Sequence, residues 1–141
     1  MEIEDTVTIY GPMGNFILDK QYENIVFIAG GIGITPIVSL IKELEKRKHQ
    51  GRVLLFYSNR NEVSAAYHVL FQNVSLTTFK YVPVYTETQG RIKEDLLIRE
   101  LQNLLDFNYF LVGTSGFINS LQQILIANGV SVSNIKKDDF G

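Results

Sequence analysis

Between Ile25 and Pro36 the chain reads IVFIAGGIGITP: an apolar run, a cluster of glycines, then threonine and proline. The run from Ile25 to Ala29 has no polar residue, which is typical of a strand buried on both faces of a parallel sheet. Glycines allow positive φ and let a ligand approach the backbone closely. Thr35 is a candidate N-cap, and Pro36 suits the first helical position, where no N–H is needed. The segment therefore predicts a strand, a tight turn and the start of a helix.

Strand-like and helix-like patterns alternate along the rest of the chain. Three more apolar runs predict buried strands, and Ser133 to Asp138 is a candidate fifth strand after a helix stop at Gly129. The three runs are Val53 to Tyr57, Phe79 to Tyr85 and Tyr109 to Val112. Between the runs, apolar residues recur with helical spacing, with a weaker helical pattern over 64–72. The clear helical stripes are Ile37, Leu40, Ile41 and Leu44; Leu97, Leu101, Leu104 and Leu105; and Phe117, Leu121, Ile124 and Leu125.

This alternation predicts an α/β fold: a doubly wound, mainly parallel five-stranded sheet with helices on both faces, as in Rossmann-like domains. In such sheets ligands bind at the carboxyl ends of the strands, so the loops after Ala29, Tyr57 and Val112 are expected to carry the site. The segment Thr6 to Leu18 does not fit the pattern, because its Gly-Pro-Met-Gly turn between two short strand-like pieces indicates a hairpin from another sheet. We expect this segment to be the tail of a preceding domain.

Composition and charge argue against several classes of function. With no cysteine, the chain can hold neither a disulfide nor a Cys-ligated zinc or iron–sulfur cluster; His49 and His68 alone could supply imidazole, and no metal site is predicted. A net charge of −2 gives no reason to expect nucleic acid as a partner. The uncharged segment 25–41 is interrupted by glycines and falls short of the ~20 apolar residues of a spanning helix. The acidic N-terminus does not resemble a secretory signal, and a cytoplasmic location is expected.

The glycine turn is a candidate phosphate-binding site. Backbone amides at the start of the following helix would face a pyrophosphate group. The same glycines are also compatible with a tight strand-to-helix turn that binds nothing. The turn lacks the Gly-Lys-Ser/Thr ending of an ATP-binding P-loop, so a kinase or ATPase is disfavoured.

Several segments resemble, in the same order, motifs of the ferredoxin–NADP reductase family. The segment Gly30 to Pro36 resembles the family's Gly-x-Gly-x-(Thr/Ala)-Pro signature. The other segments are Tyr57 to Arg60, similar to the family's second-strand loop; Val112 to Thr114, similar to its Cys-Gly-Pro or Val-Gly-Pro turn; Asp139 and Phe140, similar to its acidic and aromatic C-terminus; and Gly11 to Phe16, similar to the end of its flavin-binding barrel. The resemblance implies that residues 1–20 are the C-terminal remnant of that barrel and that residues 21–141 are an NAD(P)-binding domain.

The resemblance also implies a flavin-dependent oxidoreductase, which passes hydride from NAD(P)H to FAD and electrons on to a protein or small acceptor that the sequence does not identify. The family's Arg-x-Tyr-Ser type motif, which grips the flavin, does not occur in this chain. We therefore expect part of such an enzyme, inactive without a missing FAD-binding domain. Because the cofactors carry out hydride transfer, no catalytic acid, base or nucleophile is predicted.

The predicted cofactor-binding residues come from the matched segments. By resemblance, Thr35 and Pro36 lie under the nicotinamide and Gly113 lets the backbone approach its ribose. Phe140 lies near the flavin by resemblance and is equally compatible with a place in the core. The full set is Gly30, Gly31, Ile32, Gly33, Ile34, Thr35, Pro36, Ser58, Asn59, Arg60, Val112, Gly113, Thr114 and Phe140.

Cofactor choice depends on the loop after the second strand. NAD-specific Rossmann domains commonly place an acidic residue there, whereas this chain has Ser58, Asn59 and Arg60. A hydroxyl and a guanidinium suit a 2′-phosphate, so NADPH is slightly favoured over NADH. Arg60 is also compatible with an ordinary solvated loop residue. The missing acid argues against a methyltransferase, while a nucleotide-sensing or subunit-docking module without redox activity stays an alternative.

Overall fold

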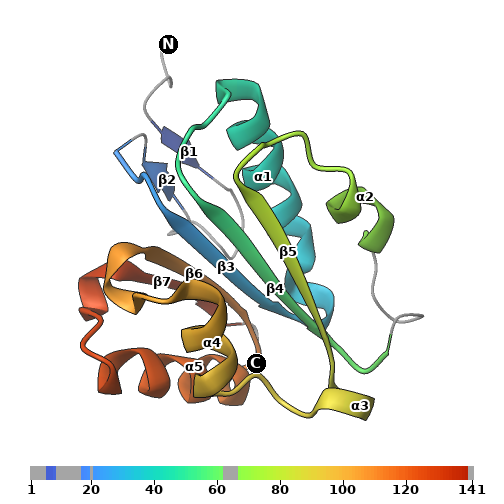
Figure 1. Ribbon diagram of the computed structural model, residues 1–141, viewed down its shortest axis with the longest axis vertical. Helices are drawn as coiled ribbons and strands as arrows, with labels where there is room; N and C mark the ends of the chain where they lie inside the picture. The colour runs from blue at the N-terminus through green and yellow to red at the C-terminus, as the bar shows by residue number, and fades with distance from the viewer. Residues whose placement is uncertain (1–5, 9–16, 20, 62–66, 140–141) are drawn as a thin grey trace.

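The computed structural model describes residues 6–8, 17–19, 21–61 and 67–139, and its centre is a five-stranded sheet (Figure 1). All neighbouring strands of this sheet run parallel, in the order β5-β4-β3-β6-β7. The strands are β3 (Ile25–Gly30), β4 (Val53–Asn59), β5 (Phe79–Tyr85), β6 (Asn108–Gly113) and β7 (Ile135–Asp139). The sequence prediction of a doubly wound, parallel α/β sheet is confirmed, including the fifth strand.

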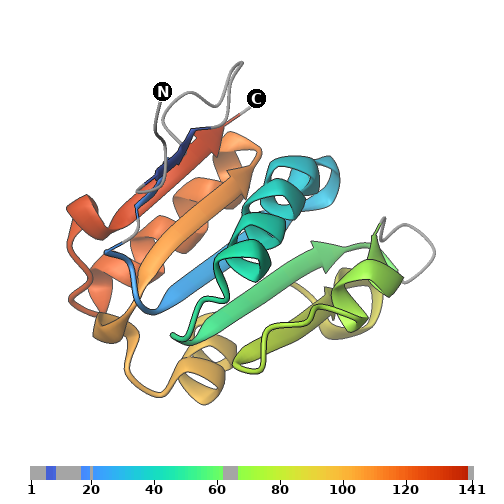
Figure 2. The same cartoon turned by 90° about the horizontal axis from the view of Figure 1, so that it is seen from above.

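Helices cover both faces of the sheet, as the view from above in Figure 2 shows. On one face, which we call the α1 face, lie α1 (Thr35–Arg47) and the short α2 (His68–Gln72). On the other, the α5 face, lie α4 (Glu94–Leu101) and α5 (Ser115–Ala127). One-turn helices complete the chain: η1 (Gly31–Ile34), α3 (Thr86–Gln89), η3 (Leu104–Asp106) and η4 (Val132–Asn134). In the described ranges no helix is both long and apolar enough to cross a membrane.

Alternate residues of each central strand feed two separate cores. In β3, Phe27 and Ala29 pack on the α1 face, while Val26 and Ile28 pack on the α5 face. All four are fully buried. Because both sides of the strand are covered, its sequence has no polar position, which is why a continuous apolar run predicted it correctly.

The helical stripe of Leu97, Leu101, Leu104 and Leu105 was predicted wrongly as one continuous helix. Leu97 and Leu101 are buried in α4, but the helix ends at Leu101 because Gln102 takes a non-helical conformation with φ 68 and ψ −51. The Asn103 side chain then accepts a hydrogen bond of 3.1 Å from the Leu105 amide, which caps η3. Leu105 is 57% exposed and does not continue the stripe. Helical spacing alone cannot reveal such a break, since the apolar residues on either side keep the right intervals.

The N-terminal segment forms a separate two-stranded sheet, as predicted for a hairpin. Strands β1 (Thr6–Thr8) and β2 (Ile17–Asp19) pair antiparallel. Leu18 is fully buried and belongs to the core of the α1 face. The Gly11–Gly14 turn lies outside the described residues, and the assignment of residues 1–20 to another domain stays a prediction.

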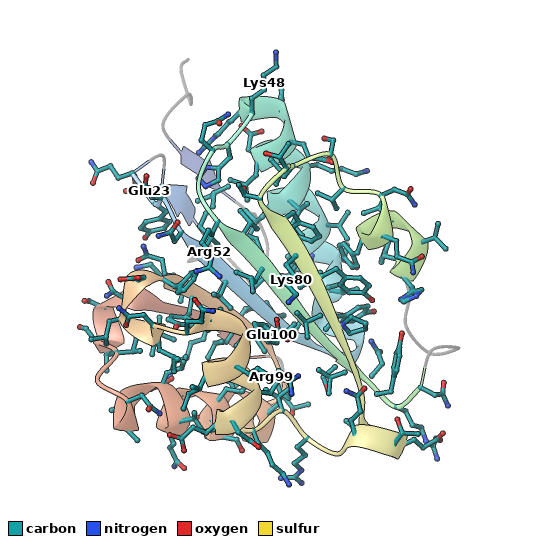
Figure 3. The ribbon with its side chains drawn as sticks, viewed as in Figure 1. Glu23, Lys48, Arg52, Lys80, Arg99 and Glu100 are labelled. Atoms are coloured by element: carbon teal, nitrogen blue, oxygen red, sulfur yellow. The ribbon has the colours of Figure 1, made fainter. Side chains whose placement is uncertain are left out.

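Several cations on the surface have local partners (Figure 3). Lys80 of β5 and Arg99 of α4 both pair with Glu100, which ties the edge strand to the helix. The guanidinium of Arg52 lies 5.1 Å from the centre of the Phe107 ring. Such contacts contribute little to stability individually, but they occupy these side chains. None of the three is therefore a free cation for a ligand.

Candidate functional site

The crevice between β3 and β6 lies at the topological switch point of the sheet. From β3 the chain winds outward to β4 and β5, then crosses to the other side for β6 and β7. The loops after β3 and β6 therefore leave the sheet in opposite directions, onto η1 and α5. Ligands of doubly wound sheets bind above this opening, at the carboxyl ends of the strands.

The glycine turn after β3 provides both space and free amides. Gly31 has a left-handed backbone with φ 60, and a Cβ added to it would meet no atom within 4 Å. The one-turn helix η1 runs directly into α1, so the first amides of this helical run have no intrahelical partner. An open space beside a glycine at a helix start fits a pyrophosphate group. The residues of this turn therefore fit a dinucleotide.

Thr35 does not cap the helix, contrary to the sequence prediction. Its backbone is helical, with φ −55 and ψ −47, and the N-cap position of α1 falls on Ile34 without a side-chain hydrogen bond. The reason is η1, which brings helical backbone before Thr35 and removes the need for a cap there. Pro36 lies in the first turn, one residue after the first helical position that was predicted for it, because α1 begins at Thr35.

The three residues after β4 that were predicted to bind the cofactor, with Ser58 and Arg60 assigned to its 2′-phosphate, do not form a common site. Ser58 is 8% exposed and faces the α5 side, whereas Asn59 faces the α1 side, since consecutive strand residues point to opposite faces. Asn59 is also buried, and its Nδ2 has no hydrogen-bond partner among the residues that the structure describes. Arg60 is exposed, with its Nε 3.5 Å from Oε2 of Glu87. Only Ser58 of the three lines the cavity described next.

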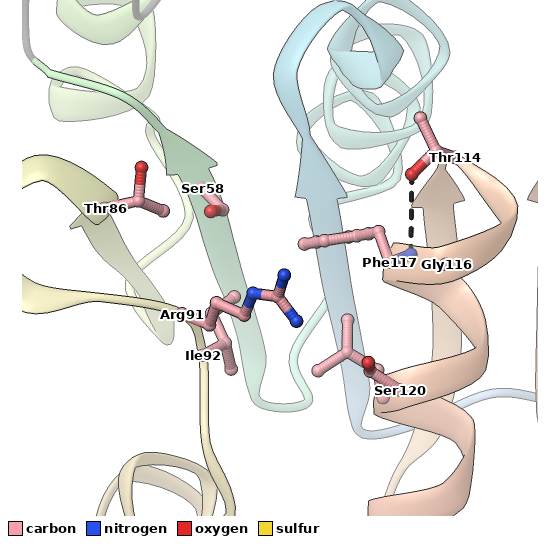
Figure 4. Close-up of a pocket in the computed structure, with 9 residues that line it drawn as sticks. Ser58, Thr86, Arg91, Ile92, Thr114, Gly116, Phe117 and Ser120 are labelled. Atoms are coloured by element: carbon pink, nitrogen blue, oxygen red, sulfur yellow. Dashed lines mark hydrogen bonds between the residues drawn. The ribbon is translucent and has the colours of Figure 1, made fainter.

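A cavity of about 390 Å³ opens on the α5 face between the ends of β4 and β6 (Figure 4). Arg91, from the connection between α3 and α4, directs its guanidinium into this space. The described residues that line the cavity are Ser58, Thr86, Arg91, Ile92, Thr114, Gly116, Phe117, Ser120 and Leu121. Sequence reasoning missed Arg91, and the available signal was a cation directly after a turn glycine, Gly90, which has φ 76.

Phe117 lies across the crevice, and its ring is the reason that two neighbouring positions must be glycine. A Cβ at Gly113 would lie 2.6 Å from Cδ2 of the Phe117 ring, and one at Gly30 would lie 3.2 Å from three ring atoms. Thr114 caps α5, because its Oγ1 accepts a hydrogen bond of 3.4 Å from the Phe117 amide. Gly30 and Gly113 are thus needed for packing of the ring, whether or not a ligand also approaches them.

We expect Gly113→Ala to destabilise the chain by about 1 to 2 kcal/mol, because the new methyl overlaps a side-chain ring that can partly move away. Urea unfolding should show this loss. In a Phe117→Ala background the same substitution should cost much less, as residues in contact are not additive. An equal cost in both backgrounds would show that Phe117 is not the reason for the glycine.

The carboxyl end of β6 is bordered by two acidic residues of β7. Val112 is fully buried and pairs in register with Asp138, and Gly113 pairs with Asp139. Burial raises the pKa of the Asp138 carboxyl, and the neighbouring Asp139 raises it further. The Ser115 hydroxyl donates a hydrogen bond of 2.9 Å to Asp139. Phe140, which follows, lies outside the described residues.

The family model described as the oxidoreductase NAD-binding domain matches residues 27–123, more than half of the chain. The chain belongs to this family. It is 27% identical over 145 residues to flavohemoprotein A of Dictyostelium discoideum, a match that spans all of this chain and 36% of that protein. It is 26% identical over 151 residues to the flavohemoprotein of Bacillus subtilis, with 97% of this chain and 38% of that protein covered. The chain thus spans little more than a third of these relatives.

Solved structures show the same fold. The flavohemoglobin of Malassezia yamatoensis, solved with bound FAD and heme, superposes with a TM-score of 0.76 at 23% identity over 85% of this chain and 32% of that one. Membership of the NAD-binding family confirms the resemblance found in the sequence, and it does not favour a methyltransferase or a module without redox function.

Proposed function

We propose that this chain binds NAD(P)H and presents it to FAD held chiefly by a second domain, as one part of a flavin-dependent oxidoreductase. The observation that carries the proposal is the turn between β3 and α1, where Gly31 leaves open space beside free helix-start amides. Membership of the oxidoreductase NAD-binding family supports a nicotinamide dinucleotide as the ligand of that turn. A cytoplasmic location is part of the same proposal.

In this proposal the dinucleotide lies across the carboxyl ends of β3, β4 and β6. Residues 30–34 hold the pyrophosphate, while Thr35, Pro36, Val112 and Gly113 border the nicotinamide end. When bound, NAD(P)H would supply a hydride that, together with one proton, reduces FAD and leaves NAD(P)⁺. The role of this chain is to fix the distance and orientation between the two cofactors, so none of its side chains needs to act as an acid or a base. Phe140 is the proposed contact to the flavin.

Calorimetric titration of the chain with NADH and with NADPH tests the binding step. We expect one molecule of dinucleotide per chain, with NADPH preferred. No detectable binding of either cofactor at millimolar concentration to a folded chain would contradict the proposal.

The flavin step is tested with this chain joined to an FAD-binding domain of a flavin-dependent relative. The joined protein should be yellow, and anaerobic addition of NAD(P)H should bleach its visible flavin absorbance. The chain alone should purify without stoichiometric FAD, because the flavin-gripping motif is absent from its sequence. Tight stoichiometric FAD on the chain alone would contradict the proposed division of labour.

A further inference from the structure

The only asparagine of the sequence that is followed by glycine, Asn128, lies directly after α5. Such a pair is prone to deamidation, because Gly129 has no Cβ to hinder the approach of its backbone nitrogen to the asparagine side chain. The Gly129 nitrogen attacks Cγ of Asn128 and loses its proton to water, while the Cγ–Nδ2 bond breaks and the departing group takes up a proton to leave as ammonia. Water then opens the succinimide ring at either carbonyl, which gives aspartate or isoaspartate. The sequence therefore carries a site that can modify itself in water.

The way in which α5 ends keeps the glycine in place. The Val130 amide donates a hydrogen bond of 3.0 Å to the Leu125 carbonyl. The Gly129 amide donates one of the same length, 3.0 Å, to the Ile126 carbonyl. These two bonds form a Schellman motif, in which the residue after the helix cap takes positive φ. Gly129 has φ 92, so a residue with a Cβ would be strained there and the fold itself retains the reactive pair.

Two hydrogen bonds hold the side chain of Asn128 in place. Its Nδ2 donates to the Ile124 carbonyl oxygen at 2.8 Å and to Oε2 of Glu94 at 3.0 Å. The first bond directs the side chain back along α5, and the second ties it to the first turn of α4, which lies beside α5 (Figure 1). For the attack, the side chain must turn toward Gly129, so both bonds must first break. Deamidation of the folded chain therefore requires local opening of the end of α5.

Deamidation would convert the contact between the two helices from attraction into repulsion. A carboxylate has no proton to donate, so the bonds to Ile124 and Glu94 would both be lost. The new negative charge would also lie beside Glu94 and at the carboxyl end of α5, where the helix dipole disfavours an anion. In isoaspartate the backbone additionally runs through the former side chain, which disrupts the cap of the helix. The contact could not form again after the reaction.

We propose that Asn128 is a self-modification site, at which spontaneous deamidation irreversibly loosens α5 from α4, and that Glu94 slows the reaction by holding the amide group. Water is the co-reactant and ammonia is the product released. The reaction needs neither dinucleotide nor flavin, so its test is independent of the proposed function.

The rate is measured by incubating the folded chain in mildly alkaline buffer and mapping its peptides for the conversion of amide to acid. We expect Asn128 to react faster than Asn119, which lies inside α5 and precedes a serine. Glu94→Ala should speed the reaction at Asn128 about three- to tenfold, the value of one exposed hydrogen bond to a charged group, and leave Asn119 unchanged. Asp95→Ala is the matched control, because it removes the same charge from the same turn of α4. It should not change the rate.

The unfolded chain separates the effect of the fold from that of the sequence. In concentrated urea Asn128 should react faster than in the folded chain, because the hydrogen bonds to Ile124 and Glu94 are absent. Glu94→Ala should then have no effect on the rate. A Glu94→Ala effect of the same size in urea would contradict the role of the folded contact.

Asn128→Asp reproduces the aspartate product and tests its consequence. Its urea unfolding midpoint should be lower than that of the wild type, because the new carboxylate faces Glu94. In a Glu94→Gln background the loss should be smaller, since the glutamine amide can donate to the new carboxylate.

Four results would overturn the proposal. They are a reaction at Asn128 that is no faster than at Asn119, equal rates in wild-type and Glu94→Ala folded chains, an equal acceleration by Asp95→Ala, and an Asn128→Asp chain as stable as the wild type. The third result would assign the effect to lost charge in α4 instead of the hydrogen bond from Asn128.

Discussion

Gly31→Val should weaken NAD(P)H binding by about a hundredfold or more while the chain still folds. A Cβ at this position meets no atom within 4 Å, so the valine side chain would occupy the open space that the pyrophosphate needs. Positive φ adds strain of roughly 1 to 2 kcal/mol for a residue with a Cβ. Calorimetry with NADPH and NADH measures the first effect, and thermal unfolding measures the second.

Two further variants separate lost space from strain. Gly31→Asn should fold better than Gly31→Val, because asparagine tolerates the left-handed region, yet it should bind as poorly because it also has a Cβ. Gly129→Val carries similar strain at φ 92, but it lies after the carboxyl end of α5, at the amino-end edge of the sheet. Its affinity should match that of the wild type. Recovery of binding in Gly31→Asn would mean that strain alone had caused the loss and that the turn does not hold the pyrophosphate.

The largest effect on stability is expected from Gly51→Ala, at about 3 kcal/mol of unfolding free energy. A Cβ at Gly51 would lie 1.7 Å from the carbonyl oxygen of Glu23 and 2.6 Å from its carbonyl carbon. Backbone atoms cannot turn aside as a side chain can, so the start of β3 or β4 would have to move. His49 Nε2 also lies 2.7 Å from the Glu23 oxygen, so the shift would break that hydrogen bond.

Urea unfolding of Gly51→Ala should be compared with that of Gly116→Ala. Gly116 lies in the first turn of α5, and a Cβ there meets no atom within 4 Å. Alanine should therefore stabilise the chain by roughly 0.5 to 1 kcal/mol, the usual gain over glycine in a helix. A loss below about 0.5 kcal/mol for Gly51→Ala would show that the loop before β4 can adjust and that the contact with Glu23 is not fixed.

The sequence predicted the sheet because burial of a strand on both faces requires a continuous run of apolar residues. Each of the runs at β3, β4 and β6 is apolar at every position that packs on either face, and this pattern needs no knowledge of distant residues. No comparable residue pattern indicates where α4 ends. Gln102 takes its positive-φ conformation two residues before η3 begins, and nothing in the spacing of the leucines predicts it.

The site was predicted in part, and the difference has a physical basis. The glycine turn is contiguous in sequence, so its residues could be named together. The cavity draws Ser58, Arg91 and Phe117 from three elements that only the folded sheet brings side by side. The separation of Ser58 from Asn59 could have been foreseen, because neighbouring residues of a strand point to opposite faces. The pairing of Arg60 with Glu87 could not.

The burial of Leu18 bears on how a neighbouring domain would be attached. Only residues 20–24 separate β2 from β3, and within that stretch Tyr22 packs against Phe110, with ring centres 6.0 Å apart. The connection is thus anchored on both sides of Asp19 instead of acting as a flexible linker. If β1 and β2 continue into a flavin-binding barrel, as proposed, its distance from the glycine turn is set by side-chain packing and not by tether length. Glycines inserted between Asp19 and Gln21 should then slow electron transfer by loosening this joint, even though the local concentration of the two cofactors would scarcely change.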